Sequence, residues 1–190
     1  MGVVDTFGSN KLIPMKYLCI ILWLMSNLPP ASAQAPISPK MLAHFEEIES
    51  LIPHRDRLNE EVSQVDVAWH LYHSLKVVNN LYEALSASNP KEYRYQWSFM
   101  RGAIFLWGDF PRGIAKSPQS VVPPDSIATE DIYAQLAEAR QKLEKYAELP
   151  PNSFYPHFAF KNINRDRSIR FLEVHTKHHL KIIRDILKDK

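Results

Sequence analysis

Residues 168–190 read SIRFLEVHTKHHLKIIRDILKDK. Apolar residues recur in this stretch at about 100° per residue, which predicts an amphipathic helix. They are Ile169, Leu172, Ile182, Ile183, Ile186 and Leu187. His175 and His179 fall inside the same apolar stripe, where Leu or Ile would be expected, and His178 falls at its edge. An i, i+4 pair shares one helix face, where two imidazoles can bind one cation.

A structural role for this pair is the alternative. Buried histidines can simply bond a carbonyl, a tyrosine hydroxyl or a carboxylate. Burying two imidazoles without partners costs on the order of a few kcal/mol, so both need one. A third histidine elsewhere in the chain would favour a metal site.

The composition predicts one helical domain. The chain has 190 residues, with 45% hydrophobic and 23% charged residues and five glycines. β-branched runs are scarce, which favours helix over sheet. The formal net charge of +2 has no basic block, so we expect no nucleic-acid partner.

The first 33 residues resemble a secretory signal peptide. The apolar run Leu18–Met25 follows Lys11 and Lys16, and Ala31–Ala33 gives an A-x-A cleavage pattern. Met15 is an alternative start. We therefore expect residues 34–190 to form a single domain, exported to the periplasm or outside a bacterial cell, with no membrane contact after cleavage. An uncleaved membrane anchor is the alternative, although the run is shorter than the roughly 20 apolar residues of a membrane span.

The chain has a single cysteine, Cys19, which lies in this leader. The mature chain would contain neither a disulfide nor a thiol nucleophile. Any bound metal must then have nitrogen and oxygen ligands.

Four long amphipathic helices are expected in the mature chain. They cover about 39–52, 65–85, 129–149 and the C-terminal stretch. Ser38, a capping box of Ser63 with Asp66, and Thr129 provide their starts. Prolines at 53, 90 and 150–151 mark their ends.

Two aromatic segments connect these helices. Residues 91–120 lie between the second and third helices and contain a possible short helix at 96–107, packed on the end of the other helices. The loop that follows carries Arg112 and Lys116, which could form an anion-binding lip or remain solvated. The second segment, 152–165, carries His157, which we do not expect to be a ligand.

The second helix supplies two more histidines. His70 lies at the border of its apolar face, and His73 lies about a sixth of a turn outside it. We expect His70 to reach the interior and His73 to lie on the surface or behind the ligands.

These features resemble the DinB/YfiT-like superfamily of metal-dependent enzymes, in a branch of unknown function. The resemblance covers about 45–188 and depends on VDVAWHLYHSLKVVNNLYEAL and RFLEVHTKHHLKIIRDIL. It implies an all-α four-helix bundle with an aromatic insert, in which His70, His175 and His179 bind a divalent cation, Zn²⁺ or Ni²⁺. The resemblance also implies that His178, next to His179, does not bind the cation. The leader and the additional His73 depart from the family pattern, and His73 leaves the third ligand open.

The resemblance implies a hydrolase or a transferase acting on a small molecule, and possibly a homodimer. Three neutral imidazoles leave a cation its full charge and an open position. Asp66 is a candidate general base, with Tyr72 and Thr176 as weaker polar candidates. The site would face a cavity lined by Trp69, Phe99 or Trp107. The alternative is a non-catalytic exported helical bundle whose histidines hold a structural metal or form a polar core.

Overall fold

The computed structural model describes residues 38–113 and 117–188. The predicted signal peptide, the possible start at Met15 and Lys116 lie outside these residues. The α-helices are α2 (Pro39–Leu51), α3 (Val67–Ser86), α4 (Phe99–Trp107), α5 (Thr129–Lys145) and α6 (Arg165–Leu187). Strands β1 (Phe154–His157) and β2 (Lys161–Asn164) precede α6, and single 3₁₀ turns cover Ile52–His54, Pro90–Glu92, Gln119–Val121 and Tyr146–Glu148.

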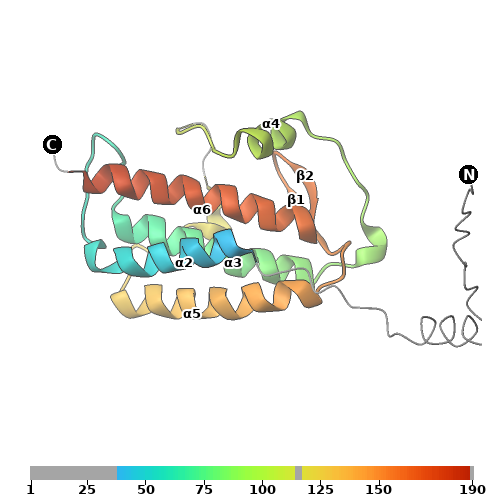
Figure 1. Ribbon diagram of the computed structural model, residues 1–190, viewed down its shortest axis with the longest axis horizontal. Coiled ribbons are helices and arrows are strands. Elements are labelled where there is room, and N and C mark those ends of the chain that lie inside the picture. The colour runs from blue at the N-terminus through green and yellow to red at the C-terminus, as the bar shows by residue number, and fades with distance from the viewer. Residues whose placement is uncertain (1–37, 114–116, 189–190) are drawn as a thin grey trace, which may run out of the picture. The chain divides into compact units, whose positions relative to one another are not determined.

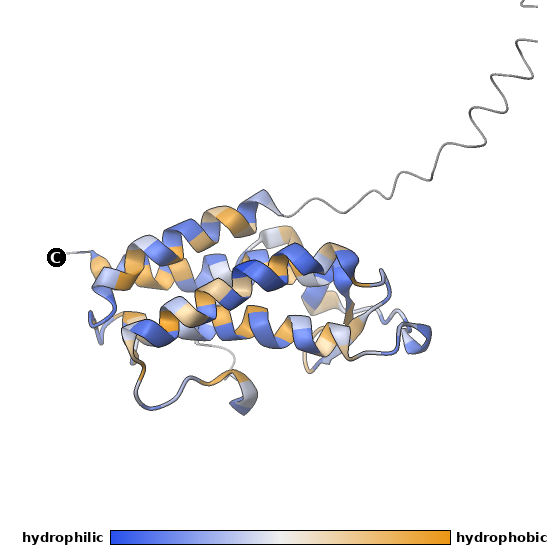
Figure 2. Cartoon of the chain, turned by 90° about the horizontal axis from the view of Figure 1, so that it is seen from below, coloured by the Kyte–Doolittle hydropathy of each residue, from blue (hydrophilic) through white to orange (hydrophobic). Residues whose placement is uncertain are grey.

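Helices α2, α3, α5 and α6 lie side by side and share one hydrophobic core (Figure 1). Each is amphipathic, as the alternation of hydrophobic and hydrophilic residues around the helices shows (Figure 2). Helix α3 packs most extensively, against both α5 and α6. The largest fully buried side chains are Phe45, Phe160, Met41, Ile48, Ile52, Leu71, Leu75, Leu85, Ile132, Leu143, Ile163 and Leu172.

The helix starts differ from two of the predicted ones. Ser38 caps α2 as expected, since its hydroxyl accepts the Met41 N–H. For α3, however, the cap is Asp66, whose carboxylate accepts the Trp69 N–H at 2.8 Å, and Ser63 takes no part. Thr129 is the first residue of α5 rather than its cap, and Asp131 accepts the Ala128 N–H instead. At α3 the carboxylate accepts an N–H of the first turn, whereas at α5 it reaches back to the N–H of the residue before the helix.

The described residues are mostly helical, as expected, but they are not all-α. Strands β1 and β2 form an antiparallel hairpin with Phe154 opposite Asn164 and His157 opposite Lys161. The Nδ1 atom of His157 accepts the N–H groups of Ala159 and Phe160, which closes the turn. The aromatic segment 152–165 thus contains a hairpin, and its Phe and Tyr residues, which favour strands, were the signal for it.

The short helix expected in the insert between the second and third long helices is present as α4, capped by Ser98. It packs against the side of α6 rather than on the end of the other helices (Figure 1). Arg170 of α6 donates to the Phe105 carbonyl and Lys177 donates to the Gly108 carbonyl. Gly108 ends the helix in the left-handed conformation at φ 73°, which suits glycine.

Within the described residues, no helix combines the length and the apolar character that crossing a bilayer would require.

Asp66 provides a test of the α3 start. We expect Asp66→Ala to lower the free energy of unfolding by about 1 kcal/mol, because one N–H of the first turn loses its acceptor. Asp66→Asn should retain most of the stability, since an amide oxygen caps as well. Urea denaturation measures both, with Asp56→Ala, whose side chain is 87% exposed, as the control. Equal stability of Asp66→Ala and the wild type would contradict the capping role.

Candidate metal centre

Helices α3 and α6 bring four imidazoles together. His70 and His73 come from α3, and His175 and His179 come from α6. The ring of His179 lies 5.2 Å from that of His70, 4.7 Å from that of His73 and 4.7 Å from that of His175. Residues about a hundred positions apart therefore form one cluster in the contact between two helices.

His73 was expected on the surface or behind the ligands, but it does not lie on the surface. It is 2% exposed and His70 is 4% exposed, so both rings are buried. Helix α3 is covered on one side by α5 and on another by α6, which widens its buried arc beyond one stripe. Trp69 also stacks on His73, with ring centroids 4.7 Å apart and planes 16° apart.

Three of the four rings meet the basic requirement for a shared cation. One ring nitrogen from each of His73, His175 and His179 lies within 4.8 Å of the others. Zinc–nitrogen bonds measure about 2.0–2.1 Å, so small side-chain rotations would bring these atoms to one ion. The structure thus groups His73, rather than His70, with the two histidines of α6.

Hydrogen bonds explain why His73 is suited to bind a cation. Its Nδ1 lies 2.8 Å from the Val121 carbonyl. A carbonyl only accepts, so Nδ1 carries the proton and Nε2 of the neutral ring keeps its lone pair. A backbone oxygen behind a histidine orients metal ligands in the same way.

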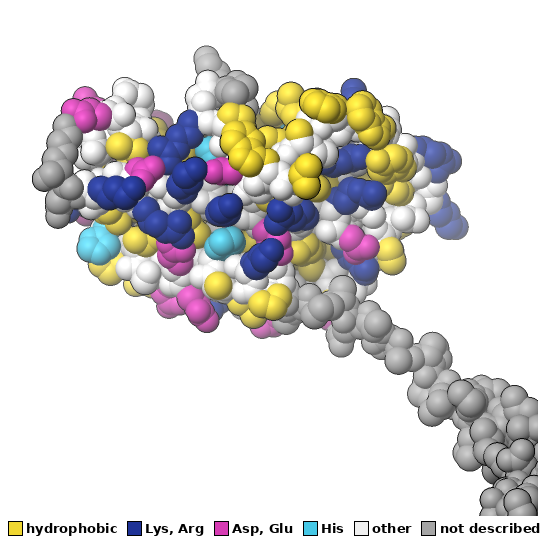
Figure 3. Space-filling view, turned by 45° about the horizontal axis from the view of Figure 1, so that its top comes forward, with side chains coloured by type: hydrophobic (Ala, Val, Ile, Leu, Met, Phe, Trp, Pro, Cys, Tyr) yellow, Lys and Arg dark blue, Asp and Glu magenta, His cyan; other side chains and the backbone are white. Residues whose placement is uncertain are grey.

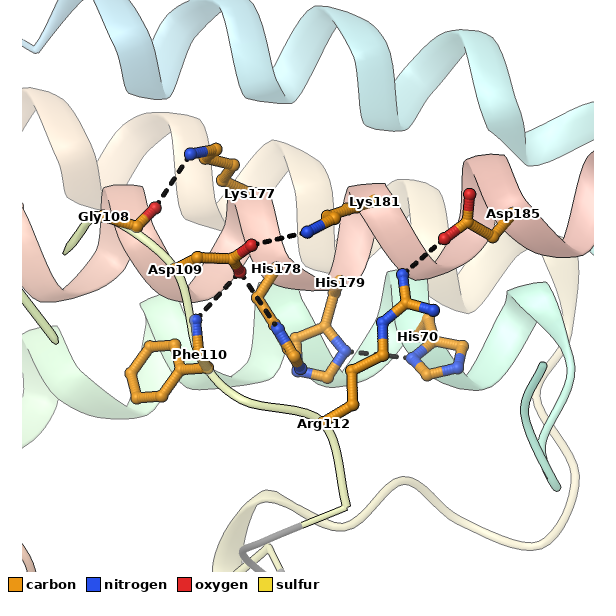
Figure 4. Close-up of polar contacts among 10 residues, drawn as sticks. All are labelled: His70, Gly108, Asp109, Phe110, Arg112, Lys177, His178, His179, Lys181 and Asp185. Carbon is orange, nitrogen blue, oxygen red and sulfur yellow. Dashed lines mark hydrogen bonds and ion pairs between the residues drawn. The ribbon is translucent and has the colours of Figure 1, made fainter.

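His70 is engaged on both nitrogens. The Ser63 hydroxyl donates to the Val65 carbonyl, so it accepts from His70 Nε2 across 3.0 Å. His70 Nδ1 then bears the lone pair and accepts from His179 Nδ1 across 2.9 Å. His70 has no free lone pair in this chain of bonds, whereas His179 keeps one on Nε2 (Figure 4).

His175 has an unsatisfied buried atom. Its Nδ1 is inaccessible to solvent and has no hydrogen-bond partner among the residues that the structure describes. Phe171 stacks on the ring at 5.5 Å and Phe110 meets its edge at 6.1 Å. Leaving a buried polar atom unpaired costs about 1–3 kcal/mol, so such an atom calls for an explanation.

Burial keeps the four rings neutral. It lowers the pKa of His70 to about 3 and that of His73 to about 4. Burial and the neighbouring histidines hold the pKa values of His175 and His179 well below their usual range. Neutral imidazole is the form that binds metals, so the cluster is ready to do so at neutral pH.

The loop after α4 is held against α6 beside this cluster. Asp109 accepts from Lys181 at 2.7 Å and lies 3.4 Å from His178 Nδ1 (Figure 4). Arg112 pairs with Asp185 at 2.6 Å. Burial lowers the pKa of His178, although Asp109 opposes that shift. His178 therefore lies at the edge of the cluster, as the helix pattern indicated, and is oriented by a carboxylate.

Other sequence candidates occupy different positions. Asp66 uses its carboxylate to cap α3. Arg112 is 39% exposed and pairs with Asp185, so it is held by a carboxylate at the surface. Phe99 and Trp107 are 73% and 69% exposed, so neither lines an enclosed cavity, whereas Trp69 contacts the histidines. His157 holds the hairpin turn.

Two further candidates are of different character. Tyr72 is half-buried under the Lys76 ammonium, which lies 6.0 Å from its ring centroid. Thr176 is fully buried, and its hydroxyl has no partner among the described residues.

Sequence reasoning missed three groups that support the cluster. Ser63 was assigned to a cap, and Val121 and Asp109 were not considered. Val121 acts through its backbone, which no side-chain pattern reveals. Asp109 directly follows Gly108. An acidic residue after a glycine that ends a helix could have drawn attention to it as a partner for a histidine.

One protein family, described as "Protein of unknown function (DUF1569)", matches residues 100–186. The matched segment runs from α4 to the end of α6, so it includes His175, His178 and His179 but not α3. No curated protein and no solved structure matches the chain.

The buried histidines predict how stability depends on pH. The folded pKa values of His70 and His73 lie below the value of 6.5 for a free histidine, so the unfolded chain binds more protons. Stability is therefore complete above pH 6.5 and is lost as pH falls toward 4, by about 1.4 kcal/mol per pH unit for each such histidine.

Urea denaturation of chelator-treated protein between pH 7 and 5 measures this slope. We expect His73→Asn to reduce the slope and His54→Gln, at an exposed position, to leave it unchanged. A flat profile for the wild type would contradict burial of neutral rings.

Proposed function

We propose that this chain binds a divalent cation, Zn²⁺ or Ni²⁺, through His73, His175 and His179. The observation that carries the proposal is the approach of three ring nitrogens to within 4.8 Å of one another between α3 and α6. Nitrogen ligands suit both ions.

The unpaired nitrogen of His175 favours a cation over a purely polar core. In a polar core each buried imidazole would have hydrogen bonds, as His70 has to Ser63 and His179. His175 Nδ1 has none among the described residues. His73 and His179 each use one nitrogen for orientation and keep the other free. The residues present therefore fit a cation.

We further propose that the fold is a four-helix bundle of the DinB/YfiT type, formed by α2, α3, α5 and α6. The support is the sequence resemblance together with the positions of the histidines, on the second and last of these four helices. His73 takes the place that the resemblance gives to His70. His70 then acts behind the ligands, where it holds His179 in one tautomer.

The reaction that this arrangement supports is hydrolysis or group transfer on a small molecule. When bound, a cation of this kind acts as a Lewis acid toward a carbonyl or a water molecule. His178 is the imidazole outside the ligand set that a carboxylate orients, so it is placed to move a proton. Phe110 and Trp69 pack around the cluster and restrict water there.

Metal analysis of the purified protein tests the proposal. We expect about one equivalent of Zn²⁺ or Ni²⁺ in the wild type and its loss in the double variant His175→Ala/His179→Ala, because two ligands are gone. His178→Ala is the matched control on the same helix and should keep the metal. Equal trace amounts in all three proteins would exclude the site.

The roles of His70 and His73 can be separated by affinity. His73→Ala removes a ligand and should abolish stoichiometric binding. His70→Ala should weaken binding by about 10- to 100-fold, the usual effect of losing a group that orients a ligand. Competition with a chelating dye measures both. The reverse order would assign the third ligand to His70.

A further inference from the structure

Helix α4 exposes most of its large apolar side chains and buries its charge, although Ile104 is buried and Phe105 is half-buried. Its side chains that face solvent are Phe99, Met100, Leu106 and Trp107, which are 73%, 53%, 91% and 69% exposed. Its one charged residue, Arg101, is 4% exposed. The Arg101 guanidinium donates to the carbonyls of Gln96, Phe160 and Asn162. A surface helix normally shows the opposite arrangement.

Three neighbouring aromatic residues extend this surface. Tyr95 and Trp97 precede α4 and are 56% and 71% exposed, and Phe158 in the hairpin turn is 69% exposed. We call the set of Tyr95, Trp97, Phe99, Met100, Leu106, Trp107 and Phe158 the α4 face. Figure 3 shows hydrophobic side chains gathered there beside Lys and Arg side chains. Contiguous exposed apolar surface of this kind marks a site of interaction.

A basic pocket adjoins the α4 face. It has a volume of about 370 Å³ and lies against Trp107, with Lys40, Arg170 and Lys177 among its lining residues. Glu173 is its one acidic lining residue, and it is bonded to Arg170 and Ser38. Three cations against one carboxylate give the pocket a positive charge that suits a phosphate.

Cations also border the other end of the α4 face. The guanidinium of Arg167 lies 4.9 Å from the ring centroid of Tyr95, and that of Arg101 lies 5.3 Å from it. Lys161, directly after the hairpin turn, is exposed. The apolar surface therefore has positive charge at both ends.

We propose that the α4 face docks on an anionic phospholipid membrane. Its Trp, Phe and Leu side chains enter the boundary between headgroups and acyl chains, and the basic pocket receives a headgroup phosphate. Aromatic and aliphatic side chains with lysine and arginine beside them are the pattern of helices that lie in a membrane surface. The helix would lie on the membrane and not cross it, so the proposal departs from the expectation of no membrane contact after leader cleavage.

The charge distribution argues against a second copy of the chain as the occupant. A two-fold contact places the same surface against itself. The pocket of Lys40, Arg170 and Lys177 and the cations at the other end would then lie near their own copies. Like charges in that position disfavour association, whereas an anionic bilayer neutralises them.

Tryptophan quenching by brominated phospholipid vesicles tests the proposal with the full chain. The chain has four tryptophans, of which Trp97 and Trp107 belong to the α4 face and Trp69 lies at the histidine cluster. The fourth, Trp23, lies in the apolar run 18–25, so every protein compared carries Trp23→Phe to remove its signal. We expect quenching by vesicles that contain phosphatidylglycerol and much less by phosphatidylcholine alone. Trp97→Phe/Trp107→Phe should lose most of it. Unchanged quenching in this double variant would show that another part of the chain makes the contact, and would overturn the proposal.

A second pair of variants tests insertion by charge. Leu106→Asp should at least halve the Trp97 and Trp107 quenching, and Leu58→Asp, at an exposed leucine of the connector before α3, should not. Lys40→Gln/Lys177→Gln should reduce the preference for phosphatidylglycerol. Equal effects of Leu106→Asp and Leu58→Asp would contradict the proposal. The proposal would also be contradicted if the wild type showed no quenching and formed a dimer that Leu106→Asp converts to a monomer.

Discussion

The contact between α3 and α6 buries four imidazoles, which is unfavourable unless their nitrogens are paired. Much of the surrounding structure supplies hydrogen bonds to these rings. Each ring needs a partner for its nitrogens, since water is excluded. The Val121 carbonyl accepts a hydrogen bond from His73, Ser63 accepts one from His70, and His70 accepts one from His179. These partners come from the segments just before α3 and just before α5, so the histidines tie connecting segments to the helix core. His175 Nδ1 has no hydrogen-bond partner among the described residues, which adds support to the metal hypothesis.

Much of the helical part could be predicted from sequence because its signal is local. The apolar period located α2, α3, α5 and α6, and the aromatic stretch at 96–107 indicated the short helix α4. The hairpin was missed because strands of four residues are too short to show a clear alternation of apolar and polar residues. The choice between Ser63 and Asp66 as a cap depended on where the first turn begins, which helix boundaries read from sequence do not resolve.

The histidine cluster was predictable in part. The i, i+4 spacing put His175 and His179 on one face, and the structure brings them within reach of each other. The second helix offered His70 and His73, and a helical wheel with one apolar face ranked them by their angle to it. That ranking failed for His73, because α3 is enclosed by two helices and by the segment that contains Val121. The distinction between ligand and supporting residue depends on hydrogen bonds from residues distant in sequence, which a wheel does not contain.

The burial of Arg101 on α4 is linked to its hydrogen bonds with the hairpin. The turn of the hairpin leaves carbonyls of Phe160 and Asn162 directed at α4, and Arg101 satisfies them together with that of Gln96. In this nine-residue helix Arg101 shares the inner face with Ile104 and the half-buried Phe105, and the other large apolar residues lie outside. From the end of that helix the chain passes through Gly108 to Asp109 and Phe110, which contact His178 and His175. The apolar surface and the histidine cluster are thus joined by a short stretch of three residues, Gly108 to Phe110.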